Sequence, residues 1–243
     1  MSIISKAKPI GKMSQSALWV IYGKSGSGKT KLASTFPKPM LYVQVGDDGS
    51  NTISDVDDVL AVRADNIQEL KQILIELKEN DEFKSVVIDT FSLILPEYII
   101  SKTDDKKKMT LQMWGEIKAY TDELVRLAHE LAKYKNVVLT CHETKEILDG
   151  LEDEILPEIR PSVSKGAMLY LEGMANFGIH TVVFKKDEIK NGKPITIFKY
   201  GCHYGTNSYY WTKTQKPSKV VLPKVVINPT FKKLKKLLNQ EEK

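Results

Sequence analysis

Short apolar runs alternate with stretches of helical periodicity along most of the sequence. The apolar runs are too short for helices and predict strands over residues 18–22, 40–45, 59–62, 85–89 and 137–140. Apolar side chains at helical spacing, together with capping residues, predict helices over residues 29–35, 66–78, 111–131, 165–174 and 230–239. This alternation is typical of an α/β domain in three layers with a mainly parallel sheet.

The C-terminal third departs from that alternation. Two strands, over about residues 178–185 and 194–200, flank Asn191-Gly192, a pair that favours a β-hairpin. A short basic helix follows Asn228-Pro229. We therefore expect one domain made of an N-terminal extension (1–17), a core (18–227) and a basic C-terminal helix or tail (228–243).

Two of the predicted helices have a distinct apolar face. In the long helix this face carries Leu111, Trp114, Ile117, Thr121, Leu124, Ala128 and Leu131. In the last helix it carries Phe231, Leu234, Leu237 and Leu238, with four lysines on the opposite side. Such a stripe is the buried side of a surface helix, so we expect both faces to pack in the core.

Composition narrows the class of protein. The chain has 243 residues, of which 42% are hydrophobic and 28% charged, as in globular proteins that bury a core. No run approaches the roughly 18 apolar residues of a membrane span, and residues 1–13 lack the apolar stretch of a secretion signal. With only Cys141 and Cys202, a disulfide framework is excluded, and we expect a cytoplasmic protein with no membrane partner.

The net charge of +5 is concentrated at one end of the chain. Residues 213–243 hold nine lysines against Glu241 and Glu242, whereas the rest of the chain is slightly acidic. Basic tails bind nucleic acid or acidic partners, but lysine-rich segments also serve as solvated surface, and both interpretations stay open. Arginine is scarce, since only Arg63, Arg126 and Arg160 occur among 36 basic residues.

One motif carries specific chemistry. Residues 23–30, GKSGSGKT, match the pattern G-x-x-x-x-G-K-[ST] of a P-loop, between an apolar strand and the start of a helix. Glycines let such a loop curl so that its backbone N–H groups converge on a phosphate. Lys29 is expected to reach the β- and γ-phosphates, and Thr30 to ligate Mg²⁺. The candidate nucleotide ligands are Gly23, Lys24, Ser25, Gly26, Ser27, Gly28, Lys29 and Thr30.

Two further strand ends carry carboxylates. Residues 86–89, VVID, place Asp89 after three apolar residues, where a Walker B aspartate provides the second anchor for Mg²⁺. Asp47 and Asp48 follow the strand at 40–45 and are candidates for orienting an attacking water. A plain Gly/Asp turn explains this second pair equally well.

A histidine ends the strand at 137–140. His142 is a candidate sensor of the γ-phosphate, although a histidine at a strand end is more often a surface residue. A zinc site built from Cys141-His142 and Cys202-His203 is disfavoured, because neighbours on a strand point to opposite faces.

This ordered set of motifs resembles the core of RecA/RadA recombinases. It is most similar to the phage nucleotide-binding proteins of the AAA type, which include Sak-type single-strand annealing ATPases. The matching elements are residues 23–30, the strand ending at Asp47/Asp48, residues 86–89 and residues 137–142. The resemblance spans residues 18 to about 225. It implies a RecA-like P-loop NTPase fold, with ATP and Mg²⁺ bound between the protomers of a homo-oligomer, either a ring or a filament.

The resemblance also implies where DNA binds. Residues 102–110 take the place of the first DNA-binding loop, and Lys102, Lys106, Lys107 and Lys108 give this segment positive charge. Residues 143–164 take the place of the second loop but carry seven acidic side chains. Lys213 and Lys216 lie where family members place a basic residue that faces the γ-phosphate of the next protomer. The glutamate that serves the family as catalytic base has no counterpart after the second strand.

Together these features predict a Mg²⁺-dependent protein that binds and hydrolyses ATP and acts on single-stranded DNA in phage recombination, annealing or replication. The host cytoplasm is then its compartment, and single-strand-binding or replication proteins are further partners. A nucleotide-binding adaptor with little turnover, such as a helicase loader or recombinase mediator, is the alternative that the missing glutamate favours. A small-molecule or nucleotide kinase is a weaker alternative, because three arginines do not supply the arginine-rich lid typical of such kinases.

Overall fold

The computed structural model describes residues 16–46, 49–102, 110–148, 156–190 and 193–239. Its strands are β1 (Leu18–Gly23), β2 (Met40–Gln44), β3 (Val59–Arg63), β4 (Ser85–Asp89), β5 (Asn136–Leu148), β6 (Leu156–Pro161), β7 (Phe177–Lys190), β8 (Lys193–His203), β9 (Lys213–Thr214) and β10 (Val226–Ile227). Its α-helices are α1 (Lys29–Ala33), α2 (Ile67–Glu76), α3 (Ile94–Lys102), α4 (Leu111–Leu131), α5 (Lys165–Met174) and α6 (Phe231–Leu238). Two 3₁₀ turns, η3 (Ser50–Ile53) and η4 (Phe91–Leu93), complete the described elements.

The strands build a sheet whose central part is parallel. Its main path runs β10-β8-β7-β1-β5-β4-β2-β3. Every neighbouring pair from β7 to β3 is parallel, whereas β8, β9 and β10 run antiparallel to their partners. The carboxyl ends of β1, β2 and β4 therefore meet at one edge, beside His142, the last residue of β5 that pairs with β1. Ligands bind at this edge in sheets of this kind. The expected mixed α/β fold with a mostly parallel sheet is confirmed.

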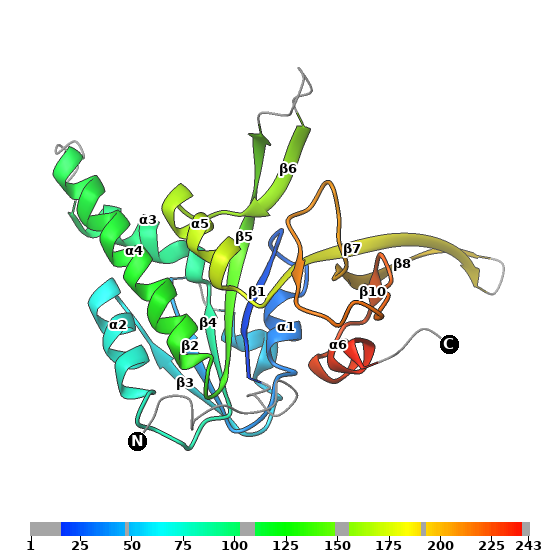
Figure 1. The fold of residues 1–243 in the computed structure, drawn as a ribbon. Helices are drawn as coiled ribbons and strands as arrows, with labels where there is room; N and C mark the ends of the chain where they lie inside the picture. The colour runs from blue at the N-terminus through cyan, green and yellow to red at the C-terminus, as the bar shows by residue number, and fades with distance from the viewer. Residues whose placement is uncertain (1–15, 47–48, 103–109, 149–155, 191–192, 240–243) are drawn as a thin grey trace.

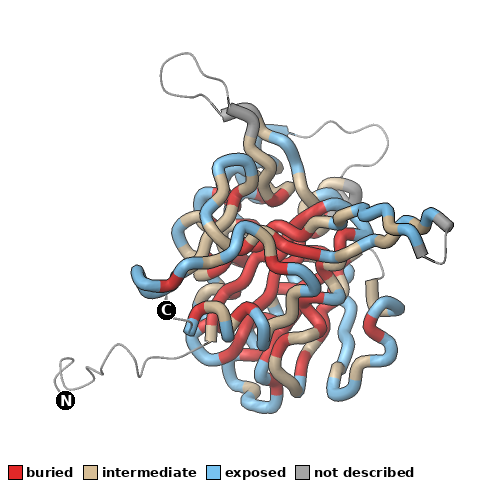
Figure 2. The backbone as a smooth tube through the Cα atoms, turned by 90° about the vertical axis from the view of Figure 1, so that its right-hand side faces the viewer, coloured by how far each residue is buried: buried red, intermediate tan, exposed pale blue. Residues whose placement is uncertain are grey.

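Helices cover both faces of the sheet and give the molecule three layers (Figure 1). Successive side chains of β1 point to opposite faces of the sheet and therefore enter two different hydrophobic cores. Leu18, Val20 and Tyr22 pack in the core that contains α2, α4 and α5, whereas Trp19 and Ile21 pack in the core that contains α1 and α6. Buried positions gather in the central strands, and the segments at the rim are mostly intermediate or exposed (Figure 2).

Side-chain caps begin the helices where the sequence predicts them. The Asn66 side chain accepts a hydrogen bond from the backbone N–H of Glu69 at 2.9 Å, and the Glu69 carboxylate accepts one from the N–H of Asp65 at 2.8 Å. This pair differs from a capping box only in that the Glu69 carboxylate accepts from the residue before the N-cap, and it fixes the start of α2. At the starts of α4, α5 and α6, the side chains of Thr110, Ser164 and Thr230 each accept a hydrogen bond from the backbone N–H three residues further on.

The prediction for the long helix is wrong at its first turns. Ile117, Thr121, Leu124, Ala128 and Leu131 are buried, but 91% of Leu111 and 48% of Trp114 are exposed. The reason is length. At 1.5 Å per residue the 21 residues of α4 extend about 31 Å, and in Figure 1 the first turns of the helix reach past the central strands. The beginning of α4 therefore extends beyond the sheet that would cover it.

Residues 143–164 differ from the loop that the sequence predicts. Strand β5 continues to Leu148 and pairs antiparallel with β6, from Glu143 opposite Pro161 to Leu148 opposite Leu156. Arg160 holds this hairpin's acidic side chains, with ion pairs to Glu146 at 2.9 Å, to Glu158 at 3.2 Å and to Glu172 of α5. Glu146 and Glu158, two of the acidic residues of this segment, thus stabilise the hairpin through ion pairs with its own arginine.

The β7–β8 hairpin is longer than predicted. The two strands pair from His180 opposite His203 to Lys190 opposite Lys193, and the turn residues 191–192 lie outside the described residues. In Figure 1 this ribbon reaches away from the body of the molecule. Helix α3 and strands β6, β9 and β10 have no counterpart among the sequence-predicted elements.

The last helix closes the core on the α1 side. Leu234 and Leu238 are buried, and the Phe231 ring lies 4.6 Å from that of Phe36 and 5.7 Å from that of Trp19. Both cysteines are buried without a disulfide, and burial raises the pKa of each thiol to about 12. Among the described helices none is long and apolar enough to cross a membrane.

Candidate functional site

The P-loop connects the carboxyl end of β1 to the start of α1, as its sequence predicts. Two of its glycines allow close approaches. A Cβ on Gly23, whose φ is +154°, would lie 2.5 Å from the Thr181 hydroxyl oxygen, and one on Gly28, whose φ is +89°, would lie 3.0 Å from the Tyr200 ring. Both positions combine positive φ with crowding, so a side chain larger than hydrogen is excluded.

Lys29 folds back into the loop. Its Nζ donates hydrogen bonds to the carbonyls of Gly23 at 3.1 Å and Lys24 at 2.9 Å. Burial lowers the pKa of this ammonium group, while the carboxylates of Asp89 and Glu143 act to raise it. A cation held between carbonyls inside the loop is ready to exchange these weak acceptors for phosphate oxygens, which bind it more strongly.

Asp89 and Thr30 meet beside Lys29. The Thr30 hydroxyl donates to Asp89 Oδ2 at 2.6 Å, and the Tyr42 hydroxyl donates to the same oxygen at 2.9 Å. The other carboxylate oxygen, Oδ1, accepts from the hydroxyls of Thr90, at 2.9 Å, and of Thr140. Four hydroxyl donors from separate elements thus fix the orientation of a carboxylate that is 3% exposed.

The donor set fits Mg²⁺. This cation takes oxygen ligands and is commonly held by one or two protein side chains plus the phosphates of its substrate. Thr30 and Asp89 present a hydroxyl and a carboxylate oxygen within 2.6 Å of each other at the edge of the P-loop. Within the described residues no cluster of three His, Cys, Asp or Glu side chains offers a dedicated metal cage.

These side chains line a cavity of about 410 Å³. Ser25, Lys29 and Thr30 form the P-loop wall, Asp89 lies at the end of β4, and His142 is the last residue of β5 that pairs with β1. The structure therefore brings His142 to the same cavity as Lys29 and Asp89. Tyr200 of β8 also lines it, a residue that sequence reasoning missed because its strand is about 170 residues further along the chain.

A second cavity of about 340 Å³ continues from the first along α1. The two share Gly28, Lys31 and Tyr200 as walls. Leu32 and Thr35 of α1 line one side, and residues 228–230 line the other. Asn228 has a φ of +46°, and its backbone N–H donates to the Tyr200 carbonyl at 2.8 Å. This cavity is largely apolar with a few polar groups, which is the usual lining of a site for an organic ligand.

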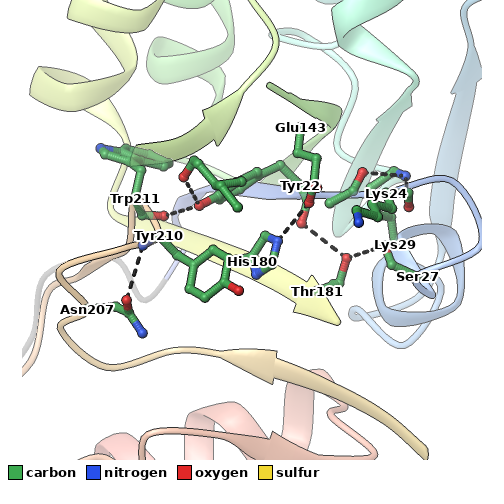
Figure 3. Close-up of polar contacts among 12 residues, drawn as sticks. Tyr22, Lys24, Ser27, Lys29, Glu143, His180, Thr181, Asn207, Tyr210 and Trp211 are labelled. Carbon is green, nitrogen blue, oxygen red and sulfur yellow. Dashed lines mark hydrogen bonds and ion pairs between the residues drawn. The ribbon is translucent and has the colours of Figure 1, made fainter. Parts of the chain in front are cut away.

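A polar network supports the other side of the P-loop (Figure 3). The hydroxyls of Ser27 and Thr181 lie 2.6 Å apart, and the Thr181 hydroxyl donates to the Tyr22 carbonyl at 3.1 Å. Next to them, the imidazole of His180 pairs with the Glu143 carboxylate at 2.8 Å. Strand β7 therefore contacts the P-loop through Thr181 and contacts β5 through the adjacent residue, His180.

His180 is held in a stack of rings. The Tyr210 ring lies 4.1 Å from that of His180 and 4.4 Å from that of His203. Burial lowers the pKa of His180, and Glu143 acts in the opposite direction. Burial also lowers the pKa of His203. Both imidazoles are therefore biased toward the neutral form. No spacing in the sequence could reveal this cluster, because strand register brings it together.

Several predicted site residues lie elsewhere or outside the described residues. Asp47, Asp48, Lys106, Lys107 and Lys108 are outside the described residues, as is the side chain of Lys102. Lys213 donates through Nζ to the carbonyls of Glu172 and Gly173, the latter at 3.2 Å, at the end of α5. Lys216 Nζ donates to the Val220 carbonyl at 2.5 Å. Within one protomer, both lysines thus hold backbone carbonyls.

Comparisons with known proteins place this geometry in a family. A family model described as an AAA domain, AAA_24, matches residues 16–217, from the start of β1 to beyond β9. No curated protein matches the sequence. Among 201 matching solved chains is the flagellar accessory protein FlaH from Methanocaldococcus jannaschii. It is 12% identical, the match covers 90% of this chain and 87% of FlaH, and the TM-score is 0.45.

Proposed function

The chain belongs to the AAA domain family AAA_24, and we propose that it is a Mg²⁺-dependent ATPase that acts on single-stranded DNA. The observation that carries this proposal is the cavity in which Lys29, Thr30 and Asp89 meet. A cation, a hydroxyl and a fixed carboxylate around a loop of backbone N–H groups are what a triphosphate with Mg²⁺ requires.

The phosphate chain would bind in the first cavity. Lys29 would leave the Gly23 and Lys24 carbonyls and bind β- and γ-phosphate oxygens. Thr30 and Asp89 would hold Mg²⁺, which neutralises the charge of the phosphates when bound. His142 lines the γ-phosphate side and would contact the terminal oxygens. These contacts stabilise charge in the transition state more than in the ground state, and that difference accelerates transfer.

The second cavity supports a nucleoside as the remainder of the ligand. It continues from the phosphate cavity past Gly28 and Lys31, and Tyr200 lies at the junction. A volume of about 340 Å³ lies within the usual range for organic ligands.

The DNA part of the proposal rests on the motif order described above and on charge. The resemblance to phage recombination and annealing ATPases spans residues 18 to about 225, and residues 102–110 supply lysines to the segment that corresponds to a DNA loop. In this proposal the protein serves phage recombination, annealing or replication.

The test is ATP hydrolysis with and without single-stranded DNA. We expect turnover that requires Mg²⁺ and rises when the DNA is added. Lys29→Ala should lower kcat by about a hundredfold or more, because removing a transition-state donor of this kind has that effect. Lys84→Ala, a change of the same type at an exposed position, should leave turnover at the wild-type rate. Wild-type turnover in Lys29→Ala would overturn the proposal.

A second candidate function is a nucleotide-binding adaptor with little turnover. The observation that favours it is the end of β2, where residues 44–49 contain no glutamate to orient water. If Asp47→Asn or Asp48→Asn stops hydrolysis and preserves ATP affinity, that aspartate is the missing base and the ATPase proposal gains. If ATP binds tightly but hydrolysis is negligible in the wild type and in both variants, the ATPase proposal is wrong and the adaptor function replaces it.

A further inference from the structure

A groove of about 800 Å³ lies at the edge of the sheet opposite the P-loop. Ser16, just before β1, and Asn136, the first residue of β5, line it at the amino ends of these parallel strands. Pro37, after α1, and residues of α6 form its other walls. Among the described residues it shares no lining residue with the two cavities beside the P-loop. We term it the α6 groove.

Three lysines of α6 give this groove its charge. Lys232, Lys235 and Lys236 line it, and their spacing of three and four residues places them on one side of a single helical turn. Among the described residues no acidic side chain lines the groove, and none of the three lysines forms an ion pair. Lys233, by contrast, donates through Nζ to the Ile227 carbonyl at 2.6 Å. The groove therefore carries uncompensated positive charge.

The half-buried position of Lys235 adds to this argument. Burial lowers the pKa of its ammonium group, and among the described residues no carboxylate acts in the opposite direction. For Lys29 of the P-loop, Asp89 does so. A cation that is partly removed from water without a counter-ion is unfavourable, and an anion beside it offsets this cost. The groove is therefore suited to a negatively charged occupant.

The groove also offers apolar surface and an amide donor. The Phe231 ring, which packs on that of Phe36, lines it together with Pro37. Asn136 is 8% exposed, and its Oδ1 accepts from the indole N–H of Trp19 at 3.2 Å. This bond fixes the amide, and the NH₂ group, which makes no hydrogen bond to another described residue, is left to donate to a ligand. The occupant should then combine acidic groups with an apolar one.

Neither end of this chain supplies the complementary charge. Residues 1–15, which precede Ser16, contain three lysines and no acid, and residues 240–243 contain two glutamates against one lysine. Nucleic acid also fits the groove poorly. The lysines at 232–236 span only about 6 Å along the helix axis, whereas a nucleic-acid backbone binds along an extended track of cations. Neighbouring carboxylates of a peptide match so compact a cluster.

We propose that the α6 groove binds an acidic segment of a partner protein, with an aromatic side chain next to its carboxylates. The lysine ammonium groups pair with these carboxylates, and the Asn136 amide donates to one of them. The aromatic ring packs on Phe231 and Pro37. A partner held here leaves the nucleotide cavities open, since they lie at the other edge of the sheet. The inference does not depend on ATP hydrolysis or on DNA binding.

Fluorescence anisotropy of a labelled peptide tests the proposal. The probe has four consecutive glutamates followed by leucine and phenylalanine, and full-length protein is titrated into it. We expect saturable binding that weakens as the salt concentration rises. Changing Lys232, Lys235 and Lys236 together to Gln should weaken binding by about tenfold or more, because three ion pairs are lost together. Because Lys235 is half-buried, Lys232→Gln with Lys236→Gln is the second variant; both of its positions are exposed, and it should bind about threefold more weakly with an unchanged circular dichroism spectrum.

A matched control separates the groove from total charge. Changing Lys118, Lys165 and Lys185 to Gln removes the same charge at exposed positions of other elements and should leave peptide affinity at the wild-type value. Replacing the glutamates of the peptide by glutamine should weaken its binding by at least as much as the triple variant does. Replacing its phenylalanine by alanine should weaken binding severalfold.

Four results would overturn the proposal. They are no saturable binding to the wild type, wild-type affinity in both lysine variants, equal affinity for the glutamine peptide, and equal loss in the control triple. Competition distinguishes the other class of occupant. If unlabelled single-stranded DNA displaces the probe at a lower concentration than unlabelled peptide does, the proposal is also wrong and the α6 groove is a nucleic-acid contact.

Discussion

Asp89 is positioned before any ligand arrives. Its carboxylate accepts hydrogen bonds from Thr30, Tyr42, Thr90 and Thr140, which come from four different segments. A carboxylate fixed in this way loses little entropy when a cation binds, which is the advantage of preorganisation. The same arrangement makes Asp89 a link between the start of α1 and two neighbouring strands, β2 and β5.

Replacing this carboxylate should separate binding from turnover. We expect Asp89→Asn to lower Mg²⁺-dependent kcat by about a hundredfold while ATP affinity changes far less, because Lys29 and the loop N–H groups remain. Titration of a fluorescent ATP analogue and steady-state hydrolysis measure the two quantities. An equal loss of both in a variant with wild-type melting temperature would mean that Asp89 mainly holds the loop.

His180 and His203 predict how stability depends on pH. Burial lowers the pKa of both imidazoles in the folded protein. The unfolded chain, with a histidine pKa of about 6.5, then binds more protons than the folded chain as the pH falls below this value. Stability is therefore present above about pH 6.5 and decreases on acidification, by linkage.

Thermal melts between pH 7.5 and 5.5 measure this effect. The melting temperature of the wild type should decrease over this interval. In His180→Asn the decrease should be smaller, even though the variant is less stable at pH 7.5 because Glu143 loses its partner. The titratable groups around His180 are Tyr22, Lys24, Glu143, His203 and Tyr210. His203→Asn serves as the second variant. A pH dependence identical in both variants and the wild type would assign the decrease to other groups.

At the scale of elements, α6 is part of the core and more than a charged surface helix. Leu234 is fully buried and Phe231 packs on Trp19 and Phe36. We expect Leu234→Ala to lower the free energy of unfolding by about 2–5 kcal/mol, the usual range for a cavity left by leucine. Lys236→Ala, on the exposed side, should change it by about 0.5 kcal/mol or less. Urea denaturation measures both, and equal small effects would show that α6 detaches easily.

The elements also show how far sequence reasoning extends. Strands β1, β4 and β5 and the P-loop were predictable because short buried runs and fixed motif spacing are local signals. The β5–β6 hairpin was not, because its acidic sequence hides a strand whose charges Arg160 compensates. Leu111 and Trp114 show the converse error, since periodicity indicates which residues share a face but not whether the sheet extends far enough to cover them.

The candidate site also contains some residues that the sequence predicts and others that it does not. Lys29, Thr30 and Asp89 could be predicted because each lies at a fixed distance from a strand end. Tyr200 and Thr181 could not, because they reach the P-loop through the pairing of β7 with β1 and of β8 with β7. Long-range register is set by the whole sheet and leaves no signature in a window of sequence.

At the scale of the whole molecule, two lysine-rich regions compete as the contact for DNA. Residues 106–108 lie outside the described residues and are assigned to DNA by resemblance. Changing Lys106, Lys107 and Lys108 together to Ala should weaken single-strand binding and flatten its salt dependence, since each lost phosphate contact removes about 0.7 from the slope. Fluorescence anisotropy at fixed ATP and several salt concentrations measures both quantities.

The control variant for this binding experiment must leave the hydrophobic core intact. A truncation that removes α6 would expose Trp19 and Phe36, so a matched triple of exposed lysines, Lys219, Lys232 and Lys236, is the better comparison. Changing these three to Ala should lower affinity less than the change at 106–108. A larger loss of DNA affinity in the control triple than in the 106–108 variant would make the C-terminal region the principal DNA contact.

The docking of α6 also has a consequence for protein synthesis. The backbone N–H of Phe231 donates to the Thr35 hydroxyl, a contact between residues 196 positions apart in the sequence. On a translating ribosome, β1 and α1 emerge long before the helix that covers them. The aromatic side chains of Trp19 and Phe36 are then open to chaperones and to aggregation until α6 itself has left the ribosome. A stalled ribosome that has not reached α6 should therefore carry a nascent chain that chaperones hold and ATP does not yet bind.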